Sequence, residues 1–386
     1  MTDAIKAEVY GWLDGQRPAM EAFLQQLVDI DSNSYDKAGT DAVADAIGAL
    51  LAPDGVVVER HGVDGFGDVL SALVPGRADG PHALLMGHRD TVFPQGTVAG
   101  RGYTRDGDLA FGPGVADMKS GLVLNCFVLR AFARAGGGPF PLRALFTADE
   151  EIGSATGRPF IEAAARGARA VLNAEPGRIS GNVVTGRKGG ASLTLDVAGR
   201  AAHAGMNHAD GISAIEVLAA KIRRLHALTD YASGVTVNVG LISGGVSVNT
   251  VAPAARAQID VRVMSLAQLD AVMERIEAIV AAEDLPGATA TLTRGHVMLP
   301  LEERHAAGLM ARYRRAAAAI GFDVDGEFTG GCADSGFTAS LGVPTLCGLG
   351  PVGGKPHTDR EFCRLETMVP RAKAVAGTIL SLADQP

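Results

Sequence analysis

The sequence lacks any uninterrupted apolar segment long enough to span a bilayer, and it has no excess of basic charge. Its 35 Lys and Arg residues stand against 43 Asp and Glu, which gives a formal net charge of -8 at pH 7. An acidic chain does not attract nucleic acid or an anionic membrane, so both are excluded as partners. The first residues are acidic and polar and do not resemble a secretion signal. We therefore expect a cytoplasmic protein.

Cysteine is also scarce. The four cysteines, Cys126, Cys332, Cys347 and Cys363, show no paired Cys-x-x-Cys spacing. This pattern argues against a thiolate zinc site and against a disulfide framework. We expect small buried side chains in a reducing compartment. Any metal ion must then be bound by nitrogen and oxygen ligands.

What the chain does contain is an alternation of strand and helix patterns, interrupted once. Its 386 residues suggest two or three domains. Alternating strands and helices predict an α/β fold with a doubly wound, mostly parallel sheet. The patterns that carry this prediction are helical periodicity at 4–30, 41–51, 119–135 and 159–165, and apolar strand runs at 56–58, 69–74, 83–86, 142–147 and 170–174. The alternation resumes with a helix at 302–320, a strand at 343–346 and a helix at 366–382.

Between these two parts lies a block with a different order. Strands at 191–197, 235–243, 255–263 and 288–294 and helices at 211–228 and 266–283 follow the order strand, helix, strand, strand, helix, strand. This is the split βαβ, or ferredoxin-like, α+β pattern. We therefore predict one domain formed by 1–187 and 296–386, interrupted by a smaller inserted domain at 188–295.

The most informative short motif is His88-Arg-Asp90 at the end of an apolar strand run. Residues two apart lie on the same side of a strand, so Asp90 is placed to hold the far ring nitrogen of His88. The near nitrogen would then be free to bind a metal ion.

Four further segments place metal-capable side chains beside strand or loop ends: Asp117, the adjacent pair Glu150-Glu151, Glu175 and His357. In an open α/β sheet, ligand-binding groups gather at the carboxyl ends of the strands. Two histidines and three carboxylates suit a pair of zinc-like divalent ions, and one carboxylate can bridge them. The adjacent acid pair allows one glutamate to bind metal while the other works as a base.

Each segment also has an ordinary interpretation. Asp117 could cap a helix, the Glu150-Glu151 pair could form a solvated turn, and His357 could be a surface histidine. Glu175 before Pro176 could simply end a strand. The metal centre is favoured because all five segments would otherwise have to carry metal-capable side chains, in this order along the chain, by coincidence.

Three residues of the inserted block bear on substrate binding. His203, in Ala-His-Ala-Gly205, could donate to the oxyanion of a tetrahedral intermediate if the domain closes over the site, although a surface turn explains it equally well. Arg262 ends a strand and Asn249 precedes that strand by a loop. A guanidinium and an amide are suitable donors to a substrate carboxylate, although a strand-end arginine is more often solvated.

Taken together, these segments resemble the di-zinc aminoacylase/carboxypeptidase superfamily. The likeness is greatest to bacterial glutamate carboxypeptidases, through the segments Asp108–Asp117, Thr293-Arg-Gly295 and Thr329–Asp334. It covers nearly the whole chain.

The resemblance implies a role for each residue of the site. Asp117 would bridge two ions, zinc or else cobalt or manganese, with His88 and Glu175 on one ion and Glu151 and His357 on the other. Glu150 would be the general base and acid, and Asp90 would orient His88. His203 would reach the oxyanion, and Arg262 with Asn249 would hold the free carboxylate. The inserted domain would be a lid or dimerisation domain, which implies a homodimer.

The chain departs from the glutamate carboxypeptidase pattern at His296, where those enzymes have a second arginine, and at Cys332-Ala333 beside the expected pocket. His296 is therefore a candidate substrate-binding residue that weakens the case for a released glutamate. We predict a zinc carboxypeptidase acting on a small peptide or N-acyl amino acid. The alternatives are an N-acyl-amino-acid deacylase of the acetylornithine deacetylase or desuccinylase type, an aromatic-amine aminohydrolase, and a catalytically silent metal-binding or dimerisation module. The presence of Glu150 and all five ligands argues against the last.

Overall fold

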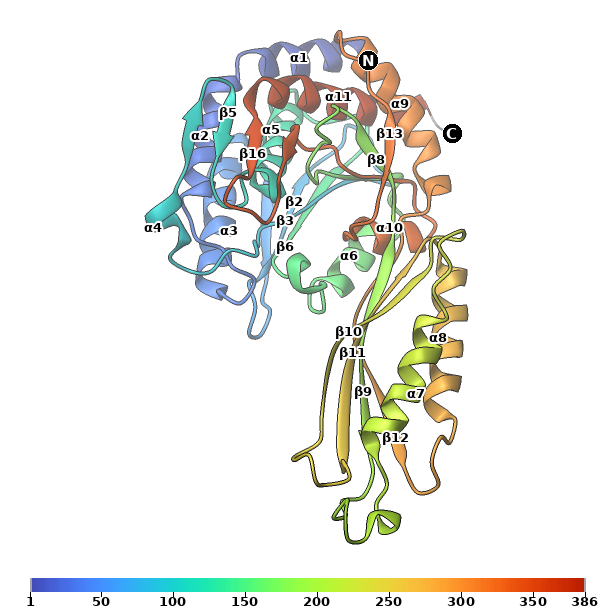
Figure 1. The fold of residues 1–386 in the computed structure, drawn as a ribbon. Helices are drawn as coiled ribbons and strands as arrows, with labels where there is room; N and C mark the ends of the chain where they lie inside the picture. The colour runs from blue at the N-terminus through green and yellow to red at the C-terminus, as the bar shows by residue number, and fades with distance from the viewer. Residues whose placement is uncertain (1, 385–386) are drawn as a thin grey trace. The chain divides into compact units, whose positions relative to one another are not determined.

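The computed structural model describes residues 2–384. The chain divides into two compact units (Figure 1). The first comprises Met1–Gly186, Leu301–Thr329 and Ala333–Pro386, and the second comprises Arg187–Pro300 with Gly330–Cys332. The second unit extends past the predicted boundary at 295 because its last strand continues to Met298.

A six-stranded sheet is the centre of the first unit, in the order β1-β2-β6-β3-β7-β14. Its strands are β1 (Val57–His61), β2 (Val69–Val74), β3 (Ala83–His88), β6 (Leu142–Thr147), β7 (Ala170–Asn173) and β14 (Thr345–Leu346). The pairings β6-β3, β3-β7 and β7-β14 are parallel, whereas β1-β2 and β2-β6 are antiparallel. The sheet is therefore mixed, with its parallel half around β3.

Helices cover this sheet. The helices of the first unit are α1 (Thr2–Asp14), α2 (Arg17–Val28), α3 (Lys37–Leu51), α4 (Thr97–Arg101), α5 (Ser120–Arg134), α6 (Arg158–Ala165), α9 (Ala307–Ala318), α10 (Ser335–Ser340) and α11 (Met368–Ser381). Helix α5 is apolar on nearly every side, because it lies between the sheet and the outer helices α1 and α11. Burial of this helix joins the outer layer to the sheet in one hydrophobic core.

Two details of the first unit differ from the pattern in the sequence. The helical periodicity at 4–30 belongs to two helices, because Gly15 follows α1 and Pro18 favours a new first turn in α2. Six short strands were not predicted, because two to five residues give too little periodicity. They are β4 (Thr104–Asp106), β5 (Leu109–Phe111), β15 (Gly353–Gly354) and β16 (Phe362–Arg364) in one sheet, and β8 (Val183–Arg187) with β13 (Gly326–Thr329) in another.

The second unit has the element order expected from the sequence. Its elements are β9 (Gly189–Ala198), α7 (Ala214–His226), β10 (Thr236–Gly244), β11 (Ala254–Val263), α8 (Leu266–Ala281) and β12 (Thr289–Met298). The sheet order is β10-β11-β9-β12, and all pairings are antiparallel. Alternate residues of β11 are buried in the core of this unit, where both helices pack on the sheet. In the sheet order given above, strand β10 lies at one edge.

The helices within residues 2–384 do not include one with the length and apolar character needed to cross a bilayer. Cys126, Cys347 and Cys363 are buried and Cys332 is partly buried, and all four are free thiols. The core burial expected for the cysteines is thus observed for three of them.

Candidate metal centre

The parallel half of the central sheet brings three of the candidate segments to one edge. His88 is the last residue of β3 and pairs with Thr147, the last residue of β6. Glu150 and Glu151 begin the short helical turn that follows β6. Glu175 follows β7, which pairs with β3 on its other side. Because parallel strands end at the same edge, the three segments meet there.

Asp117 reaches this edge from the turn Val115–Lys119 that precedes α5, and the peptide bond after it is cis. Glu361 holds this turn in place. Its carboxylate accepts hydrogen bonds from the backbone N–H groups of Ala116 at 2.8 Å, Asp117 at 2.9 Å and Gly114 at 3.2 Å. Burial raises the pKa of Glu361 to about 7.

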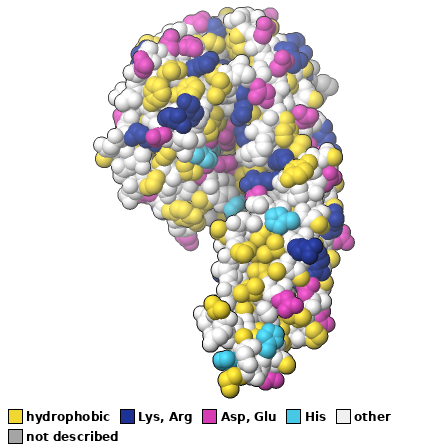
Figure 2. Space-filling model, in the orientation of Figure 1, with side chains coloured by type: hydrophobic (Ala, Val, Ile, Leu, Met, Phe, Trp, Pro, Cys, Tyr) yellow, Lys and Arg dark blue, Asp and Glu magenta, His cyan; other side chains and the backbone are white. Residues whose placement is uncertain are grey.

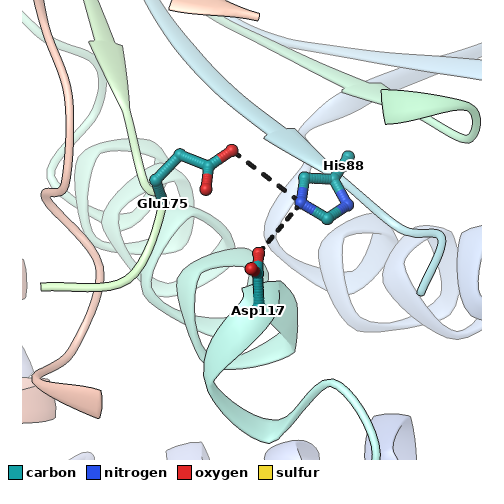
Figure 3. A group of neighbouring side chains, drawn as sticks. All are labelled: His88, Asp117 and Glu175. Carbon is teal, nitrogen blue, oxygen red and sulfur yellow. Dashed lines mark hydrogen bonds and ion pairs between the residues drawn. The ribbon is translucent and has the colours of Figure 1, made fainter. Parts of the chain in front are cut away.

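Two groups of three candidate ligands share Asp117. In the first group, His88 Nε2 lies 3.2 Å from Asp117 Oδ1 and 3.8 Å from Glu175 Oε1 (Figure 3). In the second group, His357 Nε2 lies 3.5 Å from Asp117 Oδ2 and 3.1 Å from Glu151 Oε2. Within each group the donor atoms lie within 4.8 Å of one another. The two oxygens of Asp117 thus face different histidines.

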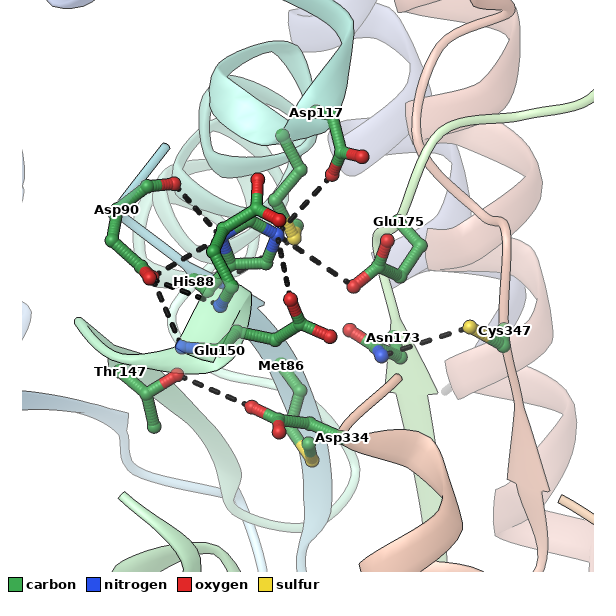
Figure 4. Close-up of polar contacts among 12 residues, drawn as sticks. Met86, His88, Asp90, Asp117, Thr147, Glu150, Asn173, Glu175, Asp334 and Cys347 are labelled. Carbon is green, nitrogen blue, oxygen red and sulfur yellow. Dashed lines mark hydrogen bonds and ion pairs between the residues drawn. The ribbon is translucent and has the colours of Figure 1, made fainter. Parts of the chain in front are cut away.

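Asp90 lies behind His88 and organises the acid pair (Figure 4). Its backbone oxygen lies 3.0 Å and its Oδ1 3.3 Å from His88 Nδ1, which places a proton on Nδ1 and turns Nε2 toward Asp117 and Glu175. The same carboxylate accepts from the backbone N–H groups of Glu150 and Glu151 and from the Ser34 hydroxyl. The buried Asp90 therefore fixes both the ring of His88 and the turn that carries Glu150 and Glu151.

Glu150 points into the same cluster, with Oε2 4.0 Å from His88 Nε2. Burial raises the pKa of Glu150 well above its ordinary value, and the nearby carboxylates of Glu175 and Asp334 add to this effect. It belongs to neither group of three candidate ligands. Glu150 thus has the position of a carboxylate beside the centre rather than within it.

The donor set fits divalent cations. Carboxylate oxygens and imidazole nitrogens are the ligands that zinc-like ions use when thiolates are absent. Among the described residues, buried Glu151 Oε1 has no hydrogen-bond partner. The cluster also favours positive charge: hydrogen bonds to Asp117 and Glu151 raise the pKa of His357 to about 10. The structure thus gathers candidate cation ligands around one shared carboxylate.

Sequence reasoning missed two buried acids near the centre. Glu361 gave no signal because its partners are backbone groups some 245 residues away in the chain. Asp334 was quoted only within a motif. It accepts from the hydroxyls of Ser154 and Thr147, and burial raises its pKa to about 7.

In the second unit, the structure brings His203 and Asn249 together. His203 pairs with Thr250 in an isolated bridge, and the N–H of Ala204 donates to the Asn249 backbone oxygen at 2.9 Å. His203 is exposed, and its Nδ1 accepts from two backbone N–H groups at 3.2 Å each. The proton must therefore sit on Nε2, which remains available as a donor.

Arg262 lies at the other end of the same sheet. Its guanidinium binds both oxygens of Asp260, at 3.0 and 2.9 Å, and donates to Cys332 Sγ at 2.8 Å. His296 is exposed within an irregular stretch of β12. The structure thus separates Arg262 from Asn249, although both were expected to hold one carboxylate.

Comparison with known proteins identifies the family of this chain. Residues 84–381 match Peptidase family M20/M25/M40. The chain belongs to this family. Membership confirms the resemblance inferred from the sequence, and it makes the protein a hydrolase of a metallopeptidase family.

Several members of the M20 family are similar over most of this chain. Carboxypeptidase G2 of Pseudomonas sp. (strain RS-16) is 29% identical over 377 residues, which cover 95% of this chain and 90% of that protein. Acetylornithine deacetylase of Myxococcus xanthus is 32% identical over 265 residues, covering 64% of this chain and 67% of the deacetylase. Both a carboxypeptidase and a deacylase are therefore among the relatives.

Solved M20-type structures share the fold. Aminopeptidase PepT from Bacillus cereus has a TM-score of 0.78 at 22% identity, covering 95% of this chain and 99% of that one. An M20 family metallo-carboxypeptidase from Sulfolobus solfataricus has a TM-score of 0.74 at 16% identity, with coverage of 95% and 99%. These likenesses support the mixed α/β fold.

Proposed function

We propose that this M20 hydrolase is a two-metal carboxypeptidase that cleaves an amide bond to a C-terminal amino acid with a free carboxylate. The observation that carries the proposal is the shared position of Asp117 between two histidine-carboxylate groups. His88 and Glu175 would hold one ion and Glu151 and His357 the other, with zinc favoured by the donor set. Two bound ions would polarise the scissile carbonyl and make water more acidic.

Side chains of this protein would transfer the protons and bind the substrate. Glu150, beside the ligands but outside both groups, takes a proton from the attacking water and delivers it to the departing amine nitrogen. Asp90 keeps the His88 proton on Nδ1 through the contact at 3.0 Å. His203 Nε2–H donates to the oxyanion, because its Nδ1 is already an acceptor. Arg262, whose guanidinium is held by Asp260, binds the carboxylate of the C-terminal amino acid.

The second unit acts in this proposal as a lid and dimerisation domain. Strand β11 runs from Ala254, beside the His203 and Asn249 loops, to Arg262 near its other end. Eight residues of strand span about 27 Å, which is too far for one small substrate to touch Arg262 and Asn249 of the same chain. A homodimer removes the conflict if His203 and Asn249 complete the site of the partner protomer.

Exposed apolar side chains support a dimer through this unit. Leu241 and Ile242 on the edge strand β10 are 63% and 68% exposed, and Val246 and Val248 follow in the adjoining loop. Figure 2 shows hydrophobic side chains, in yellow, on the surface of this unit. An edge strand with exposed apolar residues is a surface that natural proteins cover.

We expect the double substitution Leu241→Asp and Ile242→Asp to yield monomers, because two charges at an apolar edge prevent pairing. The monomers should keep their metal ions but lose most of their hydrolytic activity, since the partner's donors are then absent. Sedimentation velocity, metal analysis and kcat/KM check this together. Val57→Asp, at a half-exposed apolar residue of the first unit, is the control and should change neither assembly nor activity. A fully active monomer would contradict the shared site.

Two other functions remain as alternatives. An N-acyl-amino-acid deacylase performs the same hydrolysis with a smaller acyl group, and the acetylornithine deacetylase relative makes it the second candidate. An aromatic-amine aminohydrolase on the same centre would not need a group that binds a carboxylate. Substitution of Arg262 by Met separates this last case, because an aminohydrolase should be indifferent to it.

The test of the proposal is a substrate screen. Dipeptides and N-acyl amino acids that differ in the C-terminal residue are assayed with zinc, manganese and cobalt, and kcat/KM is compared with that of the C-terminal amides. The proposal requires that amidation of the carboxylate abolish turnover. Equal hydrolysis of acids and amides would refute it.

A further inference from the structure

A groove in the first unit adjoins the candidate metal centre. It encloses about 640 Å³ and is lined by Arg101, Phe111, Lys355, Asp359, Arg360 and Phe362, among others. It shares the loop 355–362 with the centre, because His357 lies within that loop. Glu361 of the same loop binds the backbone of the Asp117 turn at 2.8–3.2 Å. The groove and the metal ligands are therefore built on one segment.

The charge of the groove is opposite to that of the chain. Arg101, Lys355 and Arg360 contribute three cations, against one carboxylate from Asp359, whereas the whole chain carries -8. The pairing of Arg360 with Asp359 is loose, at 3.9 Å between two largely exposed side chains. Lys355 has no hydrogen bond or ion pair with any residue of the described range through its side-chain nitrogen. Two cations are thus available to a ligand.

The floor and walls add apolar surface. Phe111 and Phe362 face each other across β5 and β16, with ring centroids 6.5 Å apart. Arg101 is held by the Phe93 ring, 4.5 Å from its guanidinium carbon, and by the backbone oxygen of Thr358 at 3.4 Å. Lys355 and His357 both have positive φ, at +55° and +59°. Non-glycine residues adopt this conformation rarely, and such residues cluster at functional sites.

Resting on the proposed function, we infer that this groove binds the acyl half of the substrate and selects acyl groups that carry an anion beyond an apolar spacer. The spacer lies against Phe111 and Phe362, and the anion meets Lys355 and Arg360. The amine half has its own carboxylate partner in Arg262. The enzyme therefore prefers substrates with a negative charge at both ends.

Two matched substrates test this inference. One carries a 4-carboxybenzoyl group and the other a 4-carbamoylbenzoyl group, which has the same shape without the charge; both are joined to the amino acid that the screen identifies. Wild-type enzyme should favour the carboxylate roughly three- to tenfold in kcat/KM, because exposed charge pairs each contribute a small factor. The preference should shrink as the ionic strength rises.

Variants assign the preference to the groove. The double variant Lys355→Gln with Arg360→Gln should bring the kcat/KM values of the two substrates to within about twofold of each other. The main change should be a lower kcat/KM for the 4-carboxybenzoyl substrate. Arg360→Gln alone, which leaves the loop conformation at Lys355 and His357 untouched, should give part of the effect with normal metal content. Arg315→Gln removes the same charge from the exposed face of α9 and should leave the preference intact.

The outcomes separate this inference from the proposed function. Equal kcat/KM for the two substrates in wild type, or an unchanged preference in both groove variants, overturns the groove assignment while leaving the carboxypeptidase intact. Failure to hydrolyse any N-acyl amino acid or dipeptide overturns the proposed function itself.

Discussion

Glu150→Gln is expected to retain both metal ions and to lose about 10²–10⁴-fold in kcat. The side chain lies beside the ligand groups, 4.0 Å from His88 Nε2, but belongs to neither of them. The amide has the same shape and cannot accept a proton from water, so proton transfer to the leaving amine is lost as well. Steady-state assays with metal analysis of the same preparation measure both quantities.

The matched control is Glu162→Gln, which makes the same chemical change at a surface glutamate that accepts a hydrogen bond from Arg158. It should leave kcat unchanged. If Glu150→Gln instead loses metal, Glu150 is a ligand, and if it keeps full turnover, another group carries the proton. Either result would require a different mechanism.

Asp117→Ala is expected to lose both ions, whereas Glu175→Ala should lose only one. Asp117 alone belongs to both groups of candidate ligands, with one oxygen toward each histidine. Removing it leaves each ion with two protein ligands and removes the bridging charge that offsets ion-ion repulsion. Of the two groups of candidate ligands, Glu175 belongs only to the one that contains His88. Elemental analysis after dialysis gives the ion content per chain.

Asp64→Ala serves as the control, because it removes an exposed carboxylate outside the cluster and should keep both ions. Circular dichroism checks that Asp117→Ala is folded, since Asp117 also lies in a buried turn. Equal ion content in Asp117→Ala and wild type would refute the bridge. Loss of both ions in Glu175→Ala would show that the two positions do not load independently.

The candidate metal ligands could be chosen from sequence because their five segments fit one pattern together, although each segment alone has an ordinary interpretation. His88, Glu150 and Glu175 come directly after apolar strand runs, and parallel strands end at one edge. The structure brings these residues together with Asp117 and His357. The central α/β sheet could likewise be predicted from the sequence, because buried strands and an apolar helix such as α5 give long hydrophobic patterns.

Other parts depended on contacts that no local pattern contains. Glu361 accepts from backbone groups far away in the chain, and any loop glutamate would look the same in sequence. The groove arises from β5 and β16, each only three residues long. By contrast, the contact of Arg262 with Asp260 follows from strand alternation, which places residues two apart on one side. The length of β11 likewise separates Arg262 from Asn249, and both features were accessible from the sequence.

The most direct test of the two-metal account is a zinc titration of the metal-free protein with simultaneous measurement of amino acid release. Chelator-treated protein should be inactive toward the substrate found in the screen. Activity should rise with added zinc and reach its maximum near two ions per chain, as measured by elemental analysis of the same samples. Hydrolysis by the metal-free protein at the wild-type rate, or full activity at one ion per chain, would contradict the account.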